Sequence, residues 1–297
     1  MSYNFLDSMH EYTDQLSFEL ISKTLLETNL MNYSTVRSGL KAGTTSINLV
    51  DLVDSTNPEA SWVSDRACGW ETAGQLDYSQ VDITMVEKQT KQALCPSDLR
   101  DYYLSEKLSA SAHAEEVPFA EVISNLFVKK IKNYNEAYFA SLLITQVEAG
   151  STRTSGQSSA SDAETILADV YAVIDQVDPA FLNREDLTVV MSPSYFNLLR
   201  RALVSANLYH IAPTDSNEML DIPGTGFKAV KGTFATADIN TIIAGPMKDF
   251  VIGVGLEDDF DTLKIFYSQD NDEVRVMAAW RMGAAIVEAA AWAYNGL

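Results

Sequence analysis

The segment from Phe119 to Ala149 constrains the fold most, because it contains neither glycine nor proline. Pro118 precedes it and is suited to the first turn of a helix. An unbroken helix over this segment would be about 46 Å long, at 1.5 Å per residue. Apolar residues recur at helical spacing and predict a buried stripe, with Glu136 and three lysines on the solvent-facing side. The stripe consists of Val122, Ile123, Leu126, Phe127, Ile131, Tyr134, Tyr138 and Leu142, and the lysines are Lys129, Lys130 and Lys132.

Two strands are expected before this helix, at Thr44–Val53 and Tyr78–Ala93. In the second strand apolar residues alternate with polar ones, which is typical of a strand with one covered face. The connection between the strands is longer than an ordinary hairpin loop, and long connections are usually functional. It carries Trp62 and Trp70, which would be large exposed apolar surfaces unless a neighbouring molecule covers them.

Helices and strands alternate in the region after the long helix, which predicts an α/β or α+β arrangement. Gly150–Ser161 has the composition of a flexible connector. Ser161 and Glu164 have capping-box spacing and would open a helix that stops at Asp178-Pro179. Strands are expected at Leu187–Met191, Thr241–Ala244, Phe250–Val254, Thr262–Tyr267 and Glu273–Trp280, and helices at Asn4–Thr28, Ser97–Leu108 and after Ser192-Pro193. The first of these helices is either an ordinary core helix or an arm that docks on a partner.

Charge and composition exclude several classes of protein. Acidic residues outnumber basic ones 41 to 21, so the net charge is −20, which disfavours binding to phosphate backbones and anionic membranes. An acidic chain can nevertheless enclose DNA without binding it. No apolar run approaches the roughly 20 residues that span a bilayer, and the N-terminus lacks the regions of a secretion signal, so cytoplasmic synthesis is expected. Cys68 and Cys95 are too few for a disulfide scaffold and are expected to be buried free thiols, with a redox-sensitive bridge as the alternative.

Ser192 lies between an expected strand and an expected helix, where a nucleophilic serine could sit. The glycines of a Gly-x-Ser-x-Gly elbow are absent, since Val190 and Ser194 occupy their places. The proline and the helix that follow explain Ser192 as an N-cap instead. The short segment Gly224–Gly226 is wrongly placed for a phosphate-binding loop and is expected to be a turn.

The remaining polar residues do not predict a catalytic or metal site either. His10, His113 and His210 lack the spacing that places two imidazoles on one helix face. Two acidic clusters, Glu257–Asp261 and Asp270–Glu273, depart from the EF-hand pattern and are expected to be solvated turns. A weak Ca²⁺ site or a contact with a partner is the alternative for both clusters.

The order of these parts resembles the major capsid protein of tailed bacteriophages, from about Ser34 to the end of the chain. The closing residues Val-Arg-Val-Met-Ala-Ala-Trp-Arg-Met-Gly at 274–283 look like the end of its peripheral domain, and Ala67-Cys-Gly-Trp70 and Leu94-Cys-Pro-Ser-Asp-Leu99 are similar to shells of crAss-like gut phages. The resemblance implies an α+β fold of the Hong Kong 97 type. Its implied parts are an N-terminal arm (1–43), an E-loop hairpin (44–93), a peripheral domain (94–162) with a spine helix (119–149), an axial domain (163–245) and closing strands that complete both domains (246–297).

By the same resemblance, the chain would assemble as pentamers and hexamers into an icosahedral phage head that encloses double-stranded DNA without specific binding. It would be a virion component assembled in the cytoplasm of a bacterial host, with no catalytic residue, cofactor, metal or membrane contact. Portal, separate scaffolding and decoration proteins would be its partners. Trp62, Arg66, Trp70 and Glu71 would make the inter-subunit contacts of the E-loop tip.

Three further expectations belong to this hypothesis. Lys88 and Lys91 lie in the returning strand of the hairpin, but nothing around them marks them as reactive, so a covalent cross-link is not expected. An encapsulin-type compartment of the same fold, holding cargo enzymes, is the first alternative. An acidic cytosolic hydrolase that uses Ser192 and His210 is the second.

Overall fold

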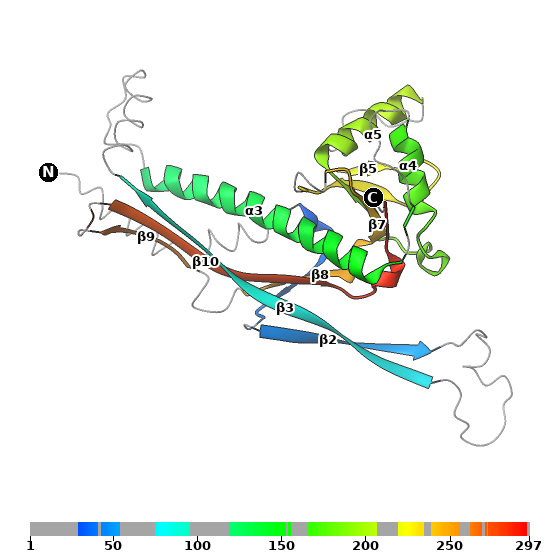
Figure 1. Cartoon of the computed structure of the whole chain (residues 1–297), viewed down its shortest axis with the longest axis horizontal. Helices are drawn as coiled ribbons and strands as arrows, with labels where there is room; N and C mark the ends of the chain where they lie inside the picture. Colours follow the sequence, from blue (N-terminus) through cyan, green and yellow to red (C-terminus); the bar gives the residue numbers. More distant parts are fainter. Residues whose placement is uncertain are drawn as a thin grey trace.

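The computed structural model describes residues 29–40, 43–53, 75–95, 119–152, 154–155, 165–206, 219–234, 239–255, 262–268, 271 and 273–295. These residues form an α+β fold with one six-stranded and one five-stranded sheet. Figure 1 shows the long helix α3 (Phe119–Gly150) lying along one face of the larger sheet, with the smaller sheet beyond one end of the helix. Within the described residues, no helix is both long and apolar enough to cross a membrane.

The larger sheet is organised around β10, which pairs with three other strands. Its strands are β1 (Thr35–Ser38), β2 (Gly43–Val53), β3 (Gln75–Leu94), β8 (Phe250–Val254), β9 (Thr262–Ser268) and β10 (Glu273–Ile286). Neighbours follow the order β1-β8-β10-β3-β2, and β9 also pairs with β10. One edge of β10 pairs with β3, while β9 and β8 share the other edge, one after the other along the strand. Every pair except β1 with β8 is antiparallel.

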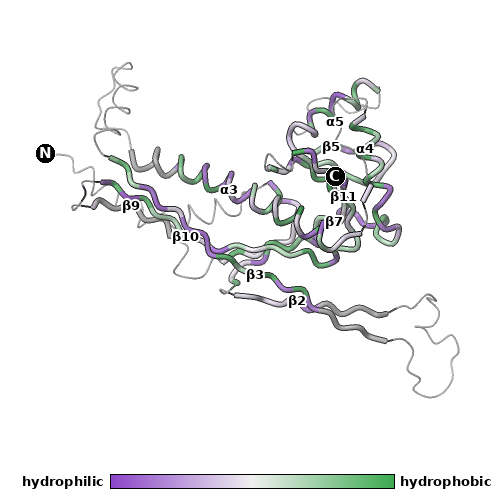
Figure 2. Tube along the Cα trace, viewed as in Figure 1, coloured by the Kyte–Doolittle hydropathy of each residue, from purple (hydrophilic) through white to green (hydrophobic). Residues whose placement is uncertain are grey.

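Helix α3 is confirmed, but the face that it buries differs from the expected stripe. The buried residues in its described part recur at helical spacing and are Phe127, Ile131, Asn135, Glu136, Phe139, Ala140, Leu143, Ile144 and Val147. Leu126 and Tyr134 were expected to be buried and are 63% and 47% exposed, whereas Glu136 was expected in solvent and is buried. The reason lies in β10, because the indole N–H of Trp280 donates to Asn135 Oδ1 at 3.1 Å and holds this polar position against the sheet. Hydrophobic residues run along both elements in Figure 2, interrupted by hydrophilic ones.

The smaller sheet has its own core. Its strands are β4 (Leu187–Met191), β5 (Met219–Asp221), β6 (Lys228–Lys231), β7 (Ile242–Pro246) and β11 (Ala293–Tyr294), and it packs with helices α4 (Thr165–Ile174) and α5 (Pro193–Ser205). The strand order is β11-β7-β4-β6-β5, so the last strand of the chain joins the sheet beside β7. Trp292 is fully buried on the side of this sheet that shares a core with α3 and the larger sheet, and a Cβ atom on Gly245 would overlap its indole ring. Short 3₁₀ turns occur at η1 (Leu30–Asn32), η3 (Pro179–Phe181), η5 (Met247–Asp249) and η6 (Ala289–Ala291).

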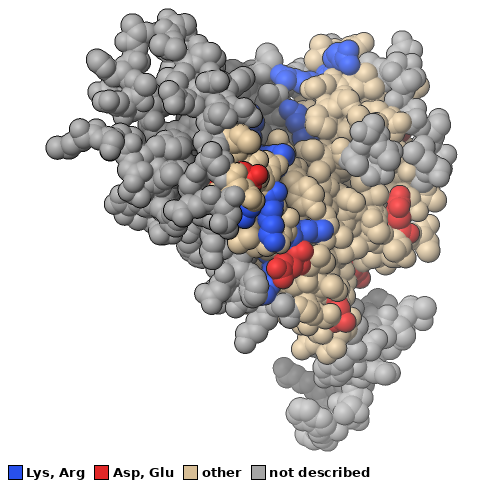
Figure 3. Space-filling view, turned by 60° about the vertical axis from the view of Figure 1, so that its left-hand side comes forward, with Lys and Arg blue, Asp and Glu red and all other residues tan. Residues whose placement is uncertain are grey.

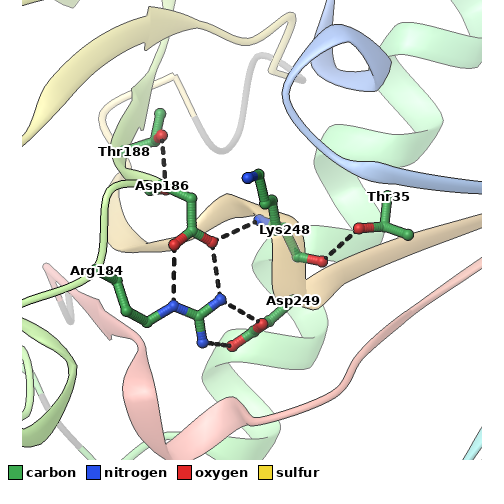
Figure 4. A network of polar contacts seen from close by, with 6 residues as sticks. All are labelled: Thr35, Arg184, Asp186, Thr188, Lys248 and Asp249. Carbon is green, nitrogen blue, oxygen red and sulfur yellow. Dashed lines mark hydrogen bonds and ion pairs between the residues drawn. The ribbon is translucent and has the colours of Figure 1, made fainter.

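A polar network occupies the place where the chain passes from the smaller sheet to the larger one (Figure 4). The guanidinium of Arg184 donates two hydrogen bonds to each of Asp186 and Asp249, at 2.8–2.9 Å. The backbone N–H of Lys248 donates to Asp186, and the hydroxyl of Thr35 in β1 donates to the Lys248 carbonyl. Burial acts to raise the pKa of Asp186, but the hydrogen bonds and charge of Arg184 outweigh it and hold that pKa below its ordinary value of 3.8. The network therefore fixes β1 and the β7–β8 connection to the strand β4.

Most of the expected elements are confirmed, and the departures have local causes. Strand β8 begins and ends where the sequence predicted, whereas β10 continues past Trp280 to Ile286 because its second half pairs with β8. Strands β1, β5, β6 and β11 were not predicted. The helices expected at Asn4–Thr28 and Ser97–Leu108, and the Ser161–Glu164 capping box, lie outside the described residues.

Candidate assembly surface

A two-stranded ribbon leaves the body of the molecule (Figure 1). Strand β2 pairs with β3 from Gly43↔Met85 to Val53↔Gln75, while the other half of β3 pairs with β10. The base of the ribbon is anchored, because Ile47, Ile83 and Met85 form a small core with residues of β8 and β10. From Asn48↔Gln80 outward the ribbon continues for about 20 Å, at roughly 3.3 Å per residue, and Figure 1 shows it extending beyond the sheet.

Such a ribbon gains little stability by itself. An isolated pair of strands is marginally stable in water, because no further strand or helix covers its faces and its apolar side chains stay in contact with water. Polar cross-strand contacts mark its exposed surface, with the Ser46 hydroxyl 2.6 Å from Asp82 and the Gln80 amide 2.9 Å from Asn48. Among the described residues, no further strand pairs with the outer edges of this ribbon, and such edges present hydrogen-bonding groups to a neighbour. These properties are those of an element that is completed by contact with another molecule.

The four residues expected to make contacts between subunits, Trp62, Arg66, Trp70 and Glu71, lie outside the described residues. The ribbon strands end at Val53 and begin again at Gln75, so all four belong to the connection between them. Their roles stay a prediction.

A groove between α3 and β3 was not predicted from the sequence. It is a hollow of about 270 Å³ whose floor includes Phe127 and Trp280 and whose rim includes Lys88, Thr90, Lys130 and Tyr134. We call this set of six residues the α3–β3 groove. A second hollow along the same strands carries Lys91 and Arg275. Figure 3 shows Lys and Arg side chains in a band down one face of the molecule, with some Asp and Glu side chains among them.

Aromatic rings in and beside the groove are in contact with one another. The Lys88 ammonium lies 4.5 Å from the centre of the Tyr138 ring, which places its charge over the ring face. Tyr138 stacks on Tyr134 with ring centres 6.3 Å apart, and Tyr134 meets the edge of Trp280 at 6.4 Å. Helical spacing alone assigned Tyr134 to the core. In the structure the neighbouring Asn135 occupies the buried position and accepts a hydrogen bond from Trp280, and a polar partner for a buried tryptophan is the signal that could have corrected the prediction.

The segment that leads into β1 is held by a buried carboxyl group. The backbone N–H of Leu30 donates to Glu136 Oε2 at 3.4 Å, and the Asn29 side chain donates to the Lys231 carbonyl at 2.7 Å. Burial raises the pKa of Glu136 from 4.5 to about 7, and the neighbouring N–H groups of Leu30 and Asn29 offset only part of this rise. Leu30 is fully buried in the core beside this contact. Glu136 thus couples α3 to the start of the described chain.

The residues weighed for catalysis have structural roles where they are described. The Ser192 hydroxyl accepts a hydrogen bond from the Tyr195 N–H at 3.3 Å, which confirms its role as the N-cap of α5. Gly224, with a φ of 75°, lies in the turn between β5 and β6, as expected. His210 lies outside the described residues, and in the part of the chain that is described no three His, Cys, Asp or Glu side chains gather as a metal site.

The thiols and acidic clusters are only partly described. Cys95 is exposed, so its expected burial is wrong, because β3 and its pairing with β10 end at the residue before it. Cys68 and the cluster 257–261 lie outside the described residues. Of the second cluster, Glu273 is the first residue of β10 and pairs with Ser268 of β9, and Asn271 lies in a turn, whereas Asp270 and Asp272 lie outside the described residues.

No protein-family model matches this chain, and no curated protein sequence is significantly similar to it. Solved structures are similar. A chain of Mycobacterium phage Che8 is 15% identical with a TM-score of 0.54, over 86% of this chain and 85% of that one. A chain of the satellite phage P4 procapsid is 11% identical with a TM-score of 0.53, over 93% and 89% of the two chains. A chain from the capsid of a native GTA particle is 16% identical with a TM-score of 0.51, over 89% and 88%. The chain therefore has the α+β capsid fold of the Hong Kong 97 type.

Proposed function

We propose that this chain is a major capsid protein whose copies form pentamers and hexamers of an icosahedral phage head. The observation that carries the proposal is the β2–β3 ribbon, which extends past its own core at Ile47 and Ile83 in a fold similar to chains of a capsid and a procapsid. A ribbon of this kind is stabilised when a neighbouring copy covers it. The role is structural and requires no catalytic residue.

The finer parts of the proposal follow from the same reasoning. Residues 1–43 serve as the N-terminal arm, 44–93 as the E-loop, 94–162 as the peripheral domain, 163–245 as the axial domain, and 246–297 complete the last two. Trp62, Arg66, Trp70 and Glu71 at the ribbon tip contact the adjacent copy. The net charge of −20 suits a shell that encloses double-stranded DNA without gripping it. Portal, scaffolding and decoration proteins are its partners in a virion assembled in the bacterial cytoplasm.

Electron microscopy of the purified recombinant chain tests the proposal. We expect closed hollow particles, with a co-expressed scaffolding protein if the chain alone does not close. A matched variant replaces residues 48–80 by Asn-Gly, because Ile47 and Val81 face each other in the ladder and a two-residue turn joins such a pair. This variant should unfold at a temperature close to that of the parent and form no particles. A parent that stays monomeric at high concentration even when the scaffolding protein is present, or a shortened variant that assembles equally well, would refute the proposal.

A further inference from the structure

The α3–β3 groove combines exposed apolar surface with positive charge. Leu126, Lys130 and Tyr134 follow one another at intervals of four residues, so they lie in a line along α3. Leu126 is 63% exposed and Tyr134 is 47% exposed. The hollow beside them has an apolar floor, and of the described residues that line it none is acidic. A surface of this kind binds a segment that carries both an apolar side chain and carboxylates.

The charge of the whole chain indicates where those carboxylates come from. Each copy has 41 acidic and 21 basic residues, so acids are in large excess over the whole chain, whereas the groove has lysines at its rim. In an assembly of identical copies, an acidic segment of one copy is attracted to a basic groove of the next, while most other contacts between such copies are repulsive. Packaged DNA is the weaker candidate, because a phosphate backbone would leave the exposed Leu126 side chain and the apolar floor uncovered.

We infer that the α3–β3 groove binds an acidic segment of a second copy of this chain, with carboxylates on Lys88 and Lys130 and an apolar side chain between them. This inference rests on the proposed assembly function. It adds a binding surface on the body of the molecule, where both lysines lie. The contact is electrostatic at its rim, so it weakens as salt concentration rises.

Charge reversal tests the contact. The double variant Lys88→Glu/Lys130→Glu should raise the protein concentration needed for assembly by about tenfold or more, because like charges would then face each other. Lys129→Glu/Lys228→Glu is the matched control, since it changes the net charge equally at two exposed positions, neither of which lines the groove. The control should stay within about twofold of the parent. Because Lys88 also contacts Tyr138, thermal unfolding of the unassembled protein is used to check that the variants fold. Leu126→Glu changes an exposed position and provides a second variant, for which we expect the same assembly defect.

Photo-cross-linking identifies the occupant. A photoreactive residue at position 126, in particles assembled from a mixture of isotopically light and heavy copies, should give cross-linked peptides that pair the two labels. Cross-links to DNA, or only within one copy, would overturn the inference. The inference would also be overturned if the Lys88→Glu/Lys130→Glu variant formed particles at the same protein concentration as the parent. That result would leave the proposed function unaffected. If the parent itself forms no particles, the proposed function fails first.

Discussion

The buried carboxyl of Glu136 predicts how the stability of the unassembled protein depends on pH. Its pKa is about 7 in the folded chain and 4.5 at its ordinary value. Between these values the folded state binds more protons than the unfolded state, so stability falls as pH rises. The contribution of the neutral carboxyl to the free energy of unfolding is therefore fully present below about pH 4.5 and is lost as the pH rises through about 7. A difference of this size corresponds to about 3 kcal/mol, at 1.36 kcal/mol for each pH unit.

The substitution Glu136→Gln should remove this dependence. Glutamine has nearly the same shape, and its carbonyl can still accept the hydrogen bond from the Leu30 N–H. At pH 5 parent and variant should have similar free energies of unfolding, and at pH 8 the variant should be more stable by up to about 3 kcal/mol. Urea unfolding at pH 5, 6, 7 and 8 measures the difference at each pH. Other carboxyls contribute equally to both proteins and cancel in this difference.

A matched variant separates burial from net charge. Glu148→Gln removes the same charge from an exposed position of the same helix. If Glu148→Gln changed the pH dependence of the unfolding free energy as much as Glu136→Gln does, the effect would be due to overall charge and not to burial. A Glu136→Gln variant that is less stable than the parent at pH 8 would contradict the reasoning outright, because it would mean that the buried carboxylate is better solvated by its neighbours than the structure indicates.

Three further substitutions test other parts of the fold by urea or thermal unfolding. Arg184→Lys should lower the free energy of unfolding by about 2 kcal/mol, a value between those of exposed and buried ion pairs. The reason is that a lysine ammonium cannot make bidentate hydrogen bonds to both aspartates. A loss below about 0.5 kcal/mol would contradict this role of the network. Gly245→Ala should cost about 1–3 kcal/mol through overlap with Trp292, and a neutral result would mean that the indole can move aside. Ser192→Ala should cost about 1 kcal/mol as a lost N-cap, while Ser192→Thr, which retains the hydroxyl, should cost less.

Local signals in the sequence predicted the elements whose causes are local. The absence of glycine and proline sets the length of α3, and Ser192-Pro193 marks the start of α5. The end of β10 was missed, because the alanines and glycine after Trp280 have weak strand propensity and only the pairing with β8 extends the strand. The end of a strand that depends on a distant partner cannot be obtained from its own residues.

The candidate surface was predictable only in outline. The sequence indicated a long hairpin, and the strands β2 and β3 confirm it, but the residues named at its tip remain untested. The α3–β3 groove and the burial of Glu136 were missed for one reason. Periodicity gives the spacing of a helix face, whereas the rotation of the helix is set here by the bond between Trp280 and Asn135, which are far apart in sequence.

Strand β3 belongs to the ribbon over one half of its length and to the body sheet over the other, with no break between the halves. A force applied to the ribbon is therefore transmitted along a continuous backbone into β10, and through the Trp280–Asn135 bond into α3. Strand β3 has no flexible connection at the point where the ribbon meets the body sheet. Any tilt of the projecting strands must be accommodated by twisting or bending β3 itself, so a displacement imposed by a neighbour becomes a mechanical load on the centre of the molecule.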